Sequence, residues 1–192
     1  EYVHLLSEIG LALIDLGNYE LGMSHYFEAL PLAQMGGMQR ENAKLSWQIA
    51  EVHYILKQFR EAKAYCIGSL KLAESNNYLV EEATVYNLLG LIAHDEGQLD
   101  SALAYFDKSL KLREDINDKV RIASTLGNIG FTLRMQGKPK QAIEYVTRAN
   151  DFMISQNNLE GQAWTNEFLG RLYIDVGNLT MAQRYLDLAE QQ

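Results

Sequence analysis

The 192-residue sequence predicts an all-α fold made of five consecutive pairs of antiparallel helices. Three observations lead to this prediction. The chain repeats itself without a gap at an interval of forty residues. Strand-like alternation of apolar and polar residues is missing, while Ala, Leu, Glu, Gln and Lys, which favour helices, are plentiful. Only two prolines occur, Pro31 and Pro139, so long uninterrupted helices are possible.

Two columns of small residues define the helix pair within each repeat. The first column contains Gly10, Ala50, Gly90, Gly130 and Gly170. The second lies twelve positions later and contains Gly22, Ala62, Ala102, Ala142 and Ala182. Small residues allow two helices to approach closely, so we expect these columns to face each other across an antiparallel pair.

Two further columns mark the turns. The turn after the first helix contains Gly17, Gly97, Gly137 and Gly177, with Lys57 as the exception. The turn after the second helix contains Asn77, Asn117 and Asn157, with Gly37 in the first copy. Gly and Asn are the residues that most readily adopt the left-handed conformation just past a helix end. Each unit is therefore helix A, a tight turn, helix B and a second tight turn.

The expected helices follow in order from these signals. The A and B helices are predicted at 2–16 and 19–35, 40–56 and 59–75, 79–96 and 99–115, 119–136 and 139–155, and 160–176 and 179–191. The repeats of this single array, residues 1–192, are 1–40, 41–80, 81–120, 121–160 and 161–192. Pro139 falls in the first turn of its helix, where proline is tolerated. Pro31 falls late in its helix and is predicted to kink or shorten it.

The residues at fixed positions of each unit resemble the tetratricopeptide repeat over essentially the whole chain. The third copy reads Tyr86, Leu89 and Gly90, followed by Ala102, Phe106 and Ser109. The first copy reads Leu6, Ile9, Gly10 and Leu13, followed by Gly22, Tyr26 and Ala29. The unit is longer than the family's usual length of about thirty-four residues, and the usual terminal proline is absent. It is similar to the long-repeat branch found in cell-polarity adaptors, kinesin light chains and bacterial peptide-sensing regulators.

The resemblance implies a right-handed superhelical solenoid that binds peptides, protein tails or partner helices on an inner face lined mainly by A helices. In the first copy, positions 6, 9, 10 and 13 are expected to pack inward, and positions 4, 7, 11 and 14 to face the groove. The predicted binding residues on or beside this groove stripe are Trp47, Glu51, Tyr54, Asn87, Leu91, His94, Asn128, Phe131, Arg134, Trp164 and Arg171.

The groove stripe is rich in residue types that anchor interfaces. It contains both tryptophans of the chain, Trp47 and Trp164, and Trp, Tyr and Arg dominate binding hot spots. The amides of Asn87 and Asn128 could pair with a peptide backbone. The alternative is that the long A helices tilt, so that the two tryptophans pack partly on neighbouring helices.

One variant of the family is disfavoured. The clamp that holds the carboxylate-terminated tails of chaperones needs Lys and Asn at two groove positions of one repeat. No repeat offers this combination, since Asn128 is accompanied by Ser124, Gly127 and Phe131.

Several function classes are not expected. A net charge of −8 disfavours nucleic acid as a partner. No apolar stretch approaches the ~20 residues of a membrane span. The four histidines belong to no close ligand set, so neither a metal nor another cofactor is predicted. Cys66 shares a column with Tyr26 and Phe106 and is expected to be an inert buried thiol.

No catalytic constellation is recognisable, so the chain is not predicted to be an enzyme. The predicted function is a protein- or peptide-binding scaffold, and a cytoplasmic location is expected. The alternative is the sensory or regulatory region of a bacterial-type signalling protein, with an output domain outside this sequence.

The ends of the sequence suggest a fragment of a larger chain. It begins at Glu1, without Met and inside a predicted helix. The last B helix keeps the apolar residues Leu179, Ala182, Leu186 and Ala189, with no further A helix to cover them. Homo-oligomerisation through this uncapped helix is one predicted consequence.

Overall fold

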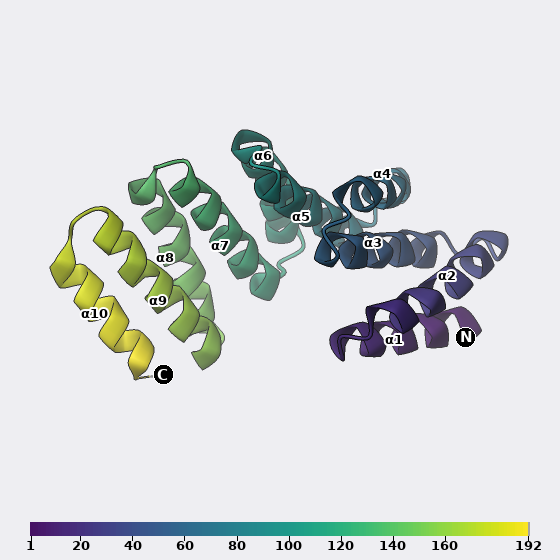
Figure 1. The fold of residues 1–192 in the computed structure, drawn as a ribbon, viewed down its shortest axis with the longest axis horizontal. Coiled ribbons are helices and arrows are strands. Elements are labelled where there is room, and N and C mark those ends of the chain that lie inside the picture. Colours follow the sequence, from purple (N-terminus) through teal and green to yellow (C-terminus); the bar gives the residue numbers. More distant parts are fainter. Residues whose placement is uncertain (192) are drawn as a thin grey trace. The chain divides into compact units, whose positions relative to one another are not determined.

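Ten α-helices and no strands make up residues 1–191, which the computed structural model describes (Figure 1). They alternate as A and B helices joined by tight turns. The helices are α1 (Tyr2–Asp15), α2 (Tyr19–Met35), α3 (Gln39–Ile55), α4 (Phe59–Asn76), α5 (Leu79–Asp95), α6 (Leu99–Asp115), α7 (Lys119–Met135), α8 (Pro139–Ser155), α9 (Leu159–Asp175) and α10 (Leu179–Glu190). Each end lies within one residue of its predicted position, which confirms the all-α fold of helix pairs. No helix in this described part is long and apolar enough to cross a membrane.

The chain divides into two compact units, one covering Glu1–Ile92 and the other beginning at Ala93. In the first unit α1 packs on α2, α2 on α3 and α3 on α4. In the second unit α6 packs on α7, and α7, α8, α9 and α10 follow side by side (Figure 1). The B helices α2 and α8 therefore each lie between their own A helix and the next one.

The turn residues adopt the left-handed conformation that their columns predicted. Gly17 has a φ of 79° and Asn77 a φ of 57°, and Lys57 takes the same conformation with a φ of 59°. At the end of α1, the backbone N–H of Asn18 donates to the carbonyl oxygen of Leu13 at 2.8 Å. This bond satisfies a carbonyl that the helix leaves without a partner.

Replacing Gly97 with alanine is expected to lower the free energy of unfolding by about 1–2 kcal/mol, because its φ is +76° and an L side chain is strained there. Replacing Gly68, inside α4, should raise it by about 0.5–1 kcal/mol, because alanine favours a helix interior. An added Cβ meets no atom within 4 Å at either position, so the two changes isolate backbone conformation. Urea unfolding of both variants measures the difference, and shifts of the same sign would contradict this account.

The small-residue columns are sites of close helix approach. A Cβ added at Gly22 would lie 2.9 Å from the carbonyl oxygen of Gly10 in the facing helix. A Cβ added at Gly10 would lie 2.5 Å from Cε1 of Tyr26. The backbones of α1 and α2 therefore pack so closely at Gly10 and Gly22 that neither position has room for a side chain.

Two expectations for the first repeat, a helix shortened at Pro31 and an inward-packed Ile9, are wrong. Pro31 does not shorten α2, which continues to Met35 and is as long as α3. Pro31 is exposed, while Ala29 and Ala33 on either side of it are fully buried, so packing holds the helix despite one missing hydrogen bond. Ile9, which was expected to pack inward, is exposed because no helix covers that side of α1 within residues 1–191.

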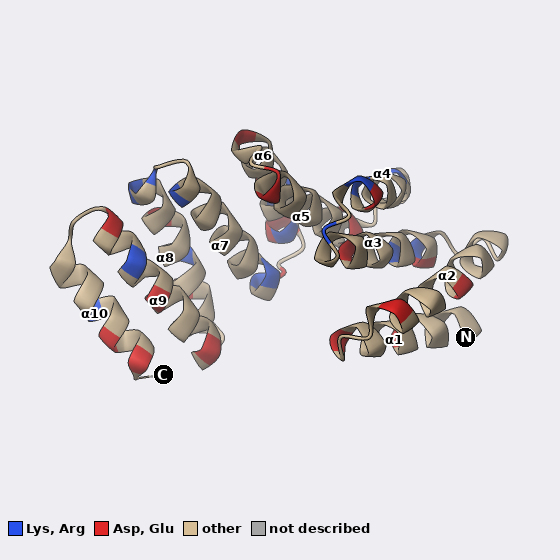
Figure 2. Ribbon diagram, viewed as in Figure 1, with Lys and Arg blue, Asp and Glu red and all other residues tan. Residues whose placement is uncertain are grey.

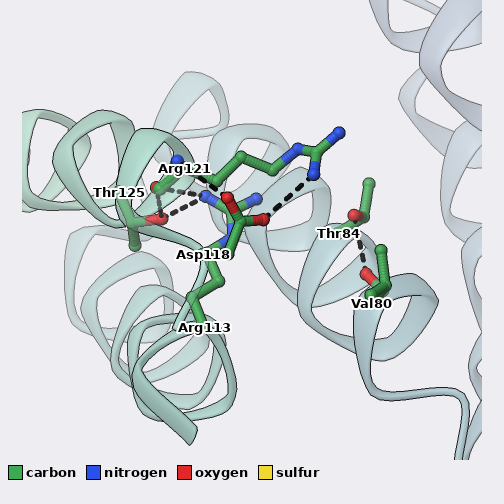
Figure 3. Close-up of polar contacts among 6 residues, drawn as sticks. All are labelled: Val80, Thr84, Arg113, Asp118, Arg121 and Thr125. Carbon is green, nitrogen blue, oxygen red and sulfur yellow. Dashed lines mark hydrogen bonds and ion pairs between the residues drawn. The ribbon is translucent and has the colours of Figure 1, made fainter. Parts of the chain in front are cut away.

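A buried arginine lies between α6 and α7 (Figure 3). Nη1 of Arg113 donates to the carbonyl oxygen of Arg121 at 2.7 Å and to Oγ1 of Thr125. Its Nε has no hydrogen-bond partner. The nearby carboxylate of Asp118 accepts instead from Nη1 of Arg121 at 2.9 Å. Arg113 occupies the column in which Ala33 and Ala73 lie, so the third repeat has a charged side chain where the first two repeats have a methyl group.

Candidate functional site

The second unit carries a cluster of three aromatic rings, which we call the aromatic shelf. It consists of Phe131 on α7 and of Trp164 and Phe168 on α9. The ring of Phe131 stacks on Phe168 with centroids 4.1 Å apart, and it lies 6.0 Å from Trp164. Phe168 is buried, whereas Phe131 is 38% and Trp164 40% exposed. Two partly exposed rings are therefore fixed from below by a third, which keeps their orientation without a ligand.

The shelf depends on a glycine in the neighbouring helix. A Cβ added at Gly127 would lie 2.6 Å from Cη2 of Trp164, so the indole lies directly over the backbone of α7. Gly127 is itself buried and does not line the surface as its position predicted. Trp164 therefore packs on α7, as the alternative interpretation expected, and still presents an exposed face.

The two helices that carry the aromatic shelf, α7 and α9, also carry two ion pairs. Nε of Arg134 donates to Oδ2 of Asp175 at 2.5 Å, and Nη2 donates to Oδ1 at 3.3 Å. The hydrogen bond to Asp175 raises the pKa of Arg134. Within α9, Nη2 of Arg171 donates to Oε1 of Glu167 at 2.5 Å. Arg134 and Arg171, which were predicted to bind a partner, thus form ion pairs with carboxylates of the chain itself.

A shallow pocket joins the shelf to the Arg134–Asp175 pair. It is lined by Phe131, Arg134, Met135, Gly137, Pro139 and Asp175. Figure 2 shows that the charges of α7 lie near its two ends, and residues 122–133 contain none. The middle of α7 is therefore uncharged, and the charges of Arg134 and Asp175 at the edge of the site compensate each other.

The predicted residues Trp47, Glu51 and Tyr54 lie in the first unit. Trp47 is half-buried, and Tyr54 faces the following turn, with its ring 6.1 Å from Phe59 and Nζ of Lys57 5.3 Å from its centroid. The residue Glu51 keeps an exposed edge, but its carboxyl group is crowded by protein. This burial, and secondarily the charge of Asp15, raises the pKa of Glu51.

The remaining predicted residues are half-buried. Asn87 and Leu91 lie on α5, and Asn128 lies on α7. Nδ1 of His94, at the end of α5, is 3.0 Å from Oγ1 of Thr132. Ser7, expected on the groove stripe, is instead buried and donates to Oε1 of Gln48 at 3.2 Å. A stripe defined by helical periodicity therefore mixes exposed residues with residues that lie between adjacent A helices.

Phe168 and Asp175 complete the site but were missed in the sequence. Asp175 follows Arg134 by forty-one residues, the same interval that separates Arg40 from Glu81 and Ser7 from Gln48. Each pair joins one A helix to the next A helix. A search for complementary residues at this interval would have found Asp175.

Other reactive groups offer no second site. Cys66 is fully buried, and burial raises the pKa of its thiol to about 12. The ring of His53 stacks on Tyr65 at 5.6 Å, and its Nδ1 lies 2.6 Å from Oε1 of Gln58. Within residues 1–191 there is no group of three or more His, Cys, Asp or Glu residues that could hold a metal ion.

Comparisons with known proteins agree with the fold of repeated helix pairs. A family model described as the tetratricopeptide repeat matches residues 41–115 and 81–155, which together cover more than half of the chain. No curated protein sequence matches the chain significantly.

Three solved structures are similar in fold. The first is a signal transduction ATPase with numerous domains and a tetratricopeptide repeat sensor from Pyrococcus horikoshii, with a TM-score of 0.89 and 16% identity over 97% of this chain and 28% of that one. Aspartyl phosphate phosphatase F from Bacillus subtilis has a TM-score of 0.85 and 18% identity over 98% of this chain and 49% of that one. A Rap protein in complex with competence and sporulation factor has a TM-score of 0.84 and 18% identity over 99% of this chain and 53% of that one. The chain therefore spans about half or less of the length of these three proteins.

Proposed function

Since the chain belongs to the tetratricopeptide repeat family, we propose that it is a binding scaffold that captures a peptide or an extended protein segment on the A-helix surface. The observation that carries this proposal is the aromatic shelf. Phe131 and Trp164 expose large apolar area on adjacent helices, and such clustered exposure is typical of interaction sites. The structural likeness to a Rap protein in complex with competence and sporulation factor supports a peptide ligand.

The chemistry of the shelf defines the ligand it would take. The exposed faces of the two rings suit a large aliphatic or aromatic side chain. The pocket beside Phe131 ends at Arg134 and Asp175, whose charges already compensate each other. A neutral polar group, such as a peptide amide, can contact both members of this pair without separating them. We therefore propose an apolar anchor residue within a largely uncharged segment, and no catalytic role.

Replacing both Phe131 and Trp164 with alanine is expected to weaken peptide binding at least tenfold, because the apolar contact area of the anchor is lost. The probe is a set of peptides selected on the wild-type chain from a phage-displayed random library. Fluorescence anisotropy of the labelled peptides measures the affinity of both chains. In a separate Trp47→Phe chain, Trp164 is the only tryptophan, and its fluorescence reports on peptides that reach the shelf.

The matched control is Phe27→Ala. Phe27 is an exposed aromatic residue on α2, and its removal should leave both the affinity and the helicity unchanged. Peptides that bind the double variant as tightly as the wild type, with normal helicity, would show that the shelf is not the binding surface.

A second candidate function is a sensory or regulatory region joined to an output domain. The likeness to a signal transduction ATPase with a tetratricopeptide repeat sensor favours it. Binding would then shift the population of conformers that the output domain recognises. The sequence of the parent gene tests this directly, because a parent chain that encodes no output domain would contradict it.

A further inference from the structure

A pocket lies between the B helices α6 and α8, over the A helix α7 that packs on both of them, and we call it the B-helix cleft. Its floor is apolar and consists of Leu103 on α6 together with Ile129 and Leu133 on α7, of which the last two are buried. Asp107 on α6 and Glu144 on α8 line its two walls. The cleft therefore has an apolar base and a carboxylate on each side.

Two hydrogen bonds join the walls of the B-helix cleft near its ends. Nε2 of Gln136, in the turn before α8, donates to Oδ1 of Asp100 on α6 at 2.7 Å. Nη2 of Arg148 on α8 donates to Oε1 of Glu114 on α6 at 3.0 Å. The lining residues of both walls lie between these two bonds along their helices. The protein itself therefore fixes the spacing of the walls, without a ligand.

The two carboxylates of the cleft lack partners in the protein. Within residues 1–191, neither Asp107 nor Glu144 takes part in a hydrogen bond or an ion pair. Lys111 and Lys140 lie one turn away on the same helices, but they do not line the cleft. Burial raises the pKa of the Asp107 carboxyl group. A cation that reaches both walls would therefore meet two negative charges that the chain does not compensate.

Tyr145 lines the same wall as Glu144, and no aromatic ring of α7 stacks on it. In two other clefts of this kind, the equivalent tyrosine stacks on an aromatic ring of the A helix at the base. These stacked pairs are His53 with Tyr65, whose ring centroids are 5.6 Å apart, and Tyr173 with Tyr185, whose centroids are 5.4 Å apart. In α7 the equivalent position is Leu133, so the B-helix cleft offers Tyr145 as a surface on which a planar group can stack.

We propose that the B-helix cleft binds the arginine side chain of a partner polypeptide. The guanidinium group is planar, always charged and weakly hydrated, and it stacks on aromatic rings. It can therefore lie against Tyr145 while donating to Asp107 on one wall and to Glu144 on the other. Its methylene stem would cover the apolar floor. The volume of the cleft, about 290 Å³, is small for a ligand pocket and suits a single side chain.

This site is separate from the aromatic shelf. Ile129 and Leu133 each lie two residues from Phe131, which is about half a helical turn, so the cleft and the shelf use different sides of α7. The proposal does not depend on the peptide site described above, because a partner could occupy either site alone. Lysine fits the cleft less well, since its ammonium group is a point charge that lacks a planar face for Tyr145.

A capped peptide, acetyl-Gly-Arg-Gly-amide, tests the proposal on the whole chain. Two-dimensional NMR should show saturable shifts of the backbone amide signals of α6, α7 and α8 near the cleft. The expected dissociation constant is on the order of 1–10 mM, as suits a single side chain. A peptide with citrulline in place of arginine has the same shape without the charge and should bind at least tenfold more weakly. Equal binding of the citrulline peptide, or no saturable shift at about 50 mM of the arginine peptide, would overturn the proposal.

The double variant Asp107→Asn/Glu144→Gln should weaken this binding at least tenfold, because it removes both acceptor charges but keeps the size of the side chains. Both residues are exposed and without partners within residues 1–191, so the helicity measured by circular dichroism should not change. The matched control is Glu20→Gln/Glu61→Gln, which makes the same change in net charge in the first unit and should bind within about twofold of wild type. If the double variant binds like the wild type, or the control loses as much affinity as the double variant, the cleft does not hold the arginine.

Discussion

Replacing Phe106 with alanine is expected to lower the free energy of unfolding by about 3–5 kcal/mol. The ring of Phe106 on α6 is completely buried and is one of the two largest fully buried side chains, together with Tyr26. The surrounding helices are held at fixed spacing by their small-residue columns, so they cannot collapse into the cavity. Urea unfolding followed by far-ultraviolet circular dichroism measures the loss.

Two controls make this prediction specific. Phe27→Ala removes the same ring from an exposed site and should change stability by no more than about 0.5 kcal/mol. Phe106→Val substitutes the residue that the same column has at Val146, and its loss should lie between those of the two alanine variants. A Phe106→Ala midpoint equal to that of wild type would mean that the interior of the second unit is loosely packed.

Replacing Arg113 with methionine is expected to stabilise the chain by about 1–4 kcal/mol. Replacement of buried charges by apolar residues of similar volume often has this effect. The guanidinium of Arg113 is buried without a carboxylate partner of its own, and Nε makes no hydrogen bond. Methionine is already present in this column as Met153.

The groups that Arg113 contacts keep other partners in the variant. Oγ1 of Thr125 still donates to the carbonyl oxygen of Arg121 at 2.9 Å, so this carbonyl oxygen keeps a donor and the hydroxyl group keeps an acceptor. The control is Arg121→Met, which removes only an exposed ion pair with Asp118 and should have a small effect. If Arg113→Met lowers the free energy of unfolding by more than about 1 kcal/mol, the hydrogen bonds of the arginine contribute more than the desolvation of its guanidinium group costs.

The gain in stability of the Arg113→Met variant over the wild type should depend on pH. Burial lowers the pKa of Arg113 from its ordinary value to about 10; the charge of Asp118 raises it and that of Arg121 lowers it further. Since the folded chain then binds fewer protons than the unfolded chain between these two values, rising pH stabilises the wild type there. The difference in unfolding free energy between variant and wild type should therefore be constant near neutral pH and shrink above about pH 10. An unchanged difference at pH 11 would contradict the assigned pKa.

The helices and turns were predictable because they depend on local rules repeated five times. A glycine or asparagine at a fixed position ends each helix whatever surrounds it, and even Lys57 follows the backbone of its column. The predicted shortening at Pro31 failed because burial of Ala29 and Ala33 outweighs a local backbone preference. Local rules therefore identify the elements, while packing decides how far they extend.

The site was only partly predictable. Periodicity placed Phe131 and Trp164 on one surface, and the structure brings them together. It could not show that Gly127 makes room for the indole, or that Phe168 supports both rings from below, because these contacts depend on the distance between two helices. The burial of Arg113 could not be predicted either, since a charged residue near a helix end normally faces water.

The constant interval between contacting residues also bears on how such a gene can change length. Polar contacts recur at forty-one residues in Ser7–Gln48, Arg40–Glu81 and Arg134–Asp175. Recombination between copies that adds or removes forty codons would rejoin an A helix to a B helix in the same register. An exchange whose length is not a multiple of forty residues would shift the columns of one helix relative to those of the helix on which it packs. Unequal crossing-over can thus lengthen or shorten the array while each new junction reuses a contact that already folds.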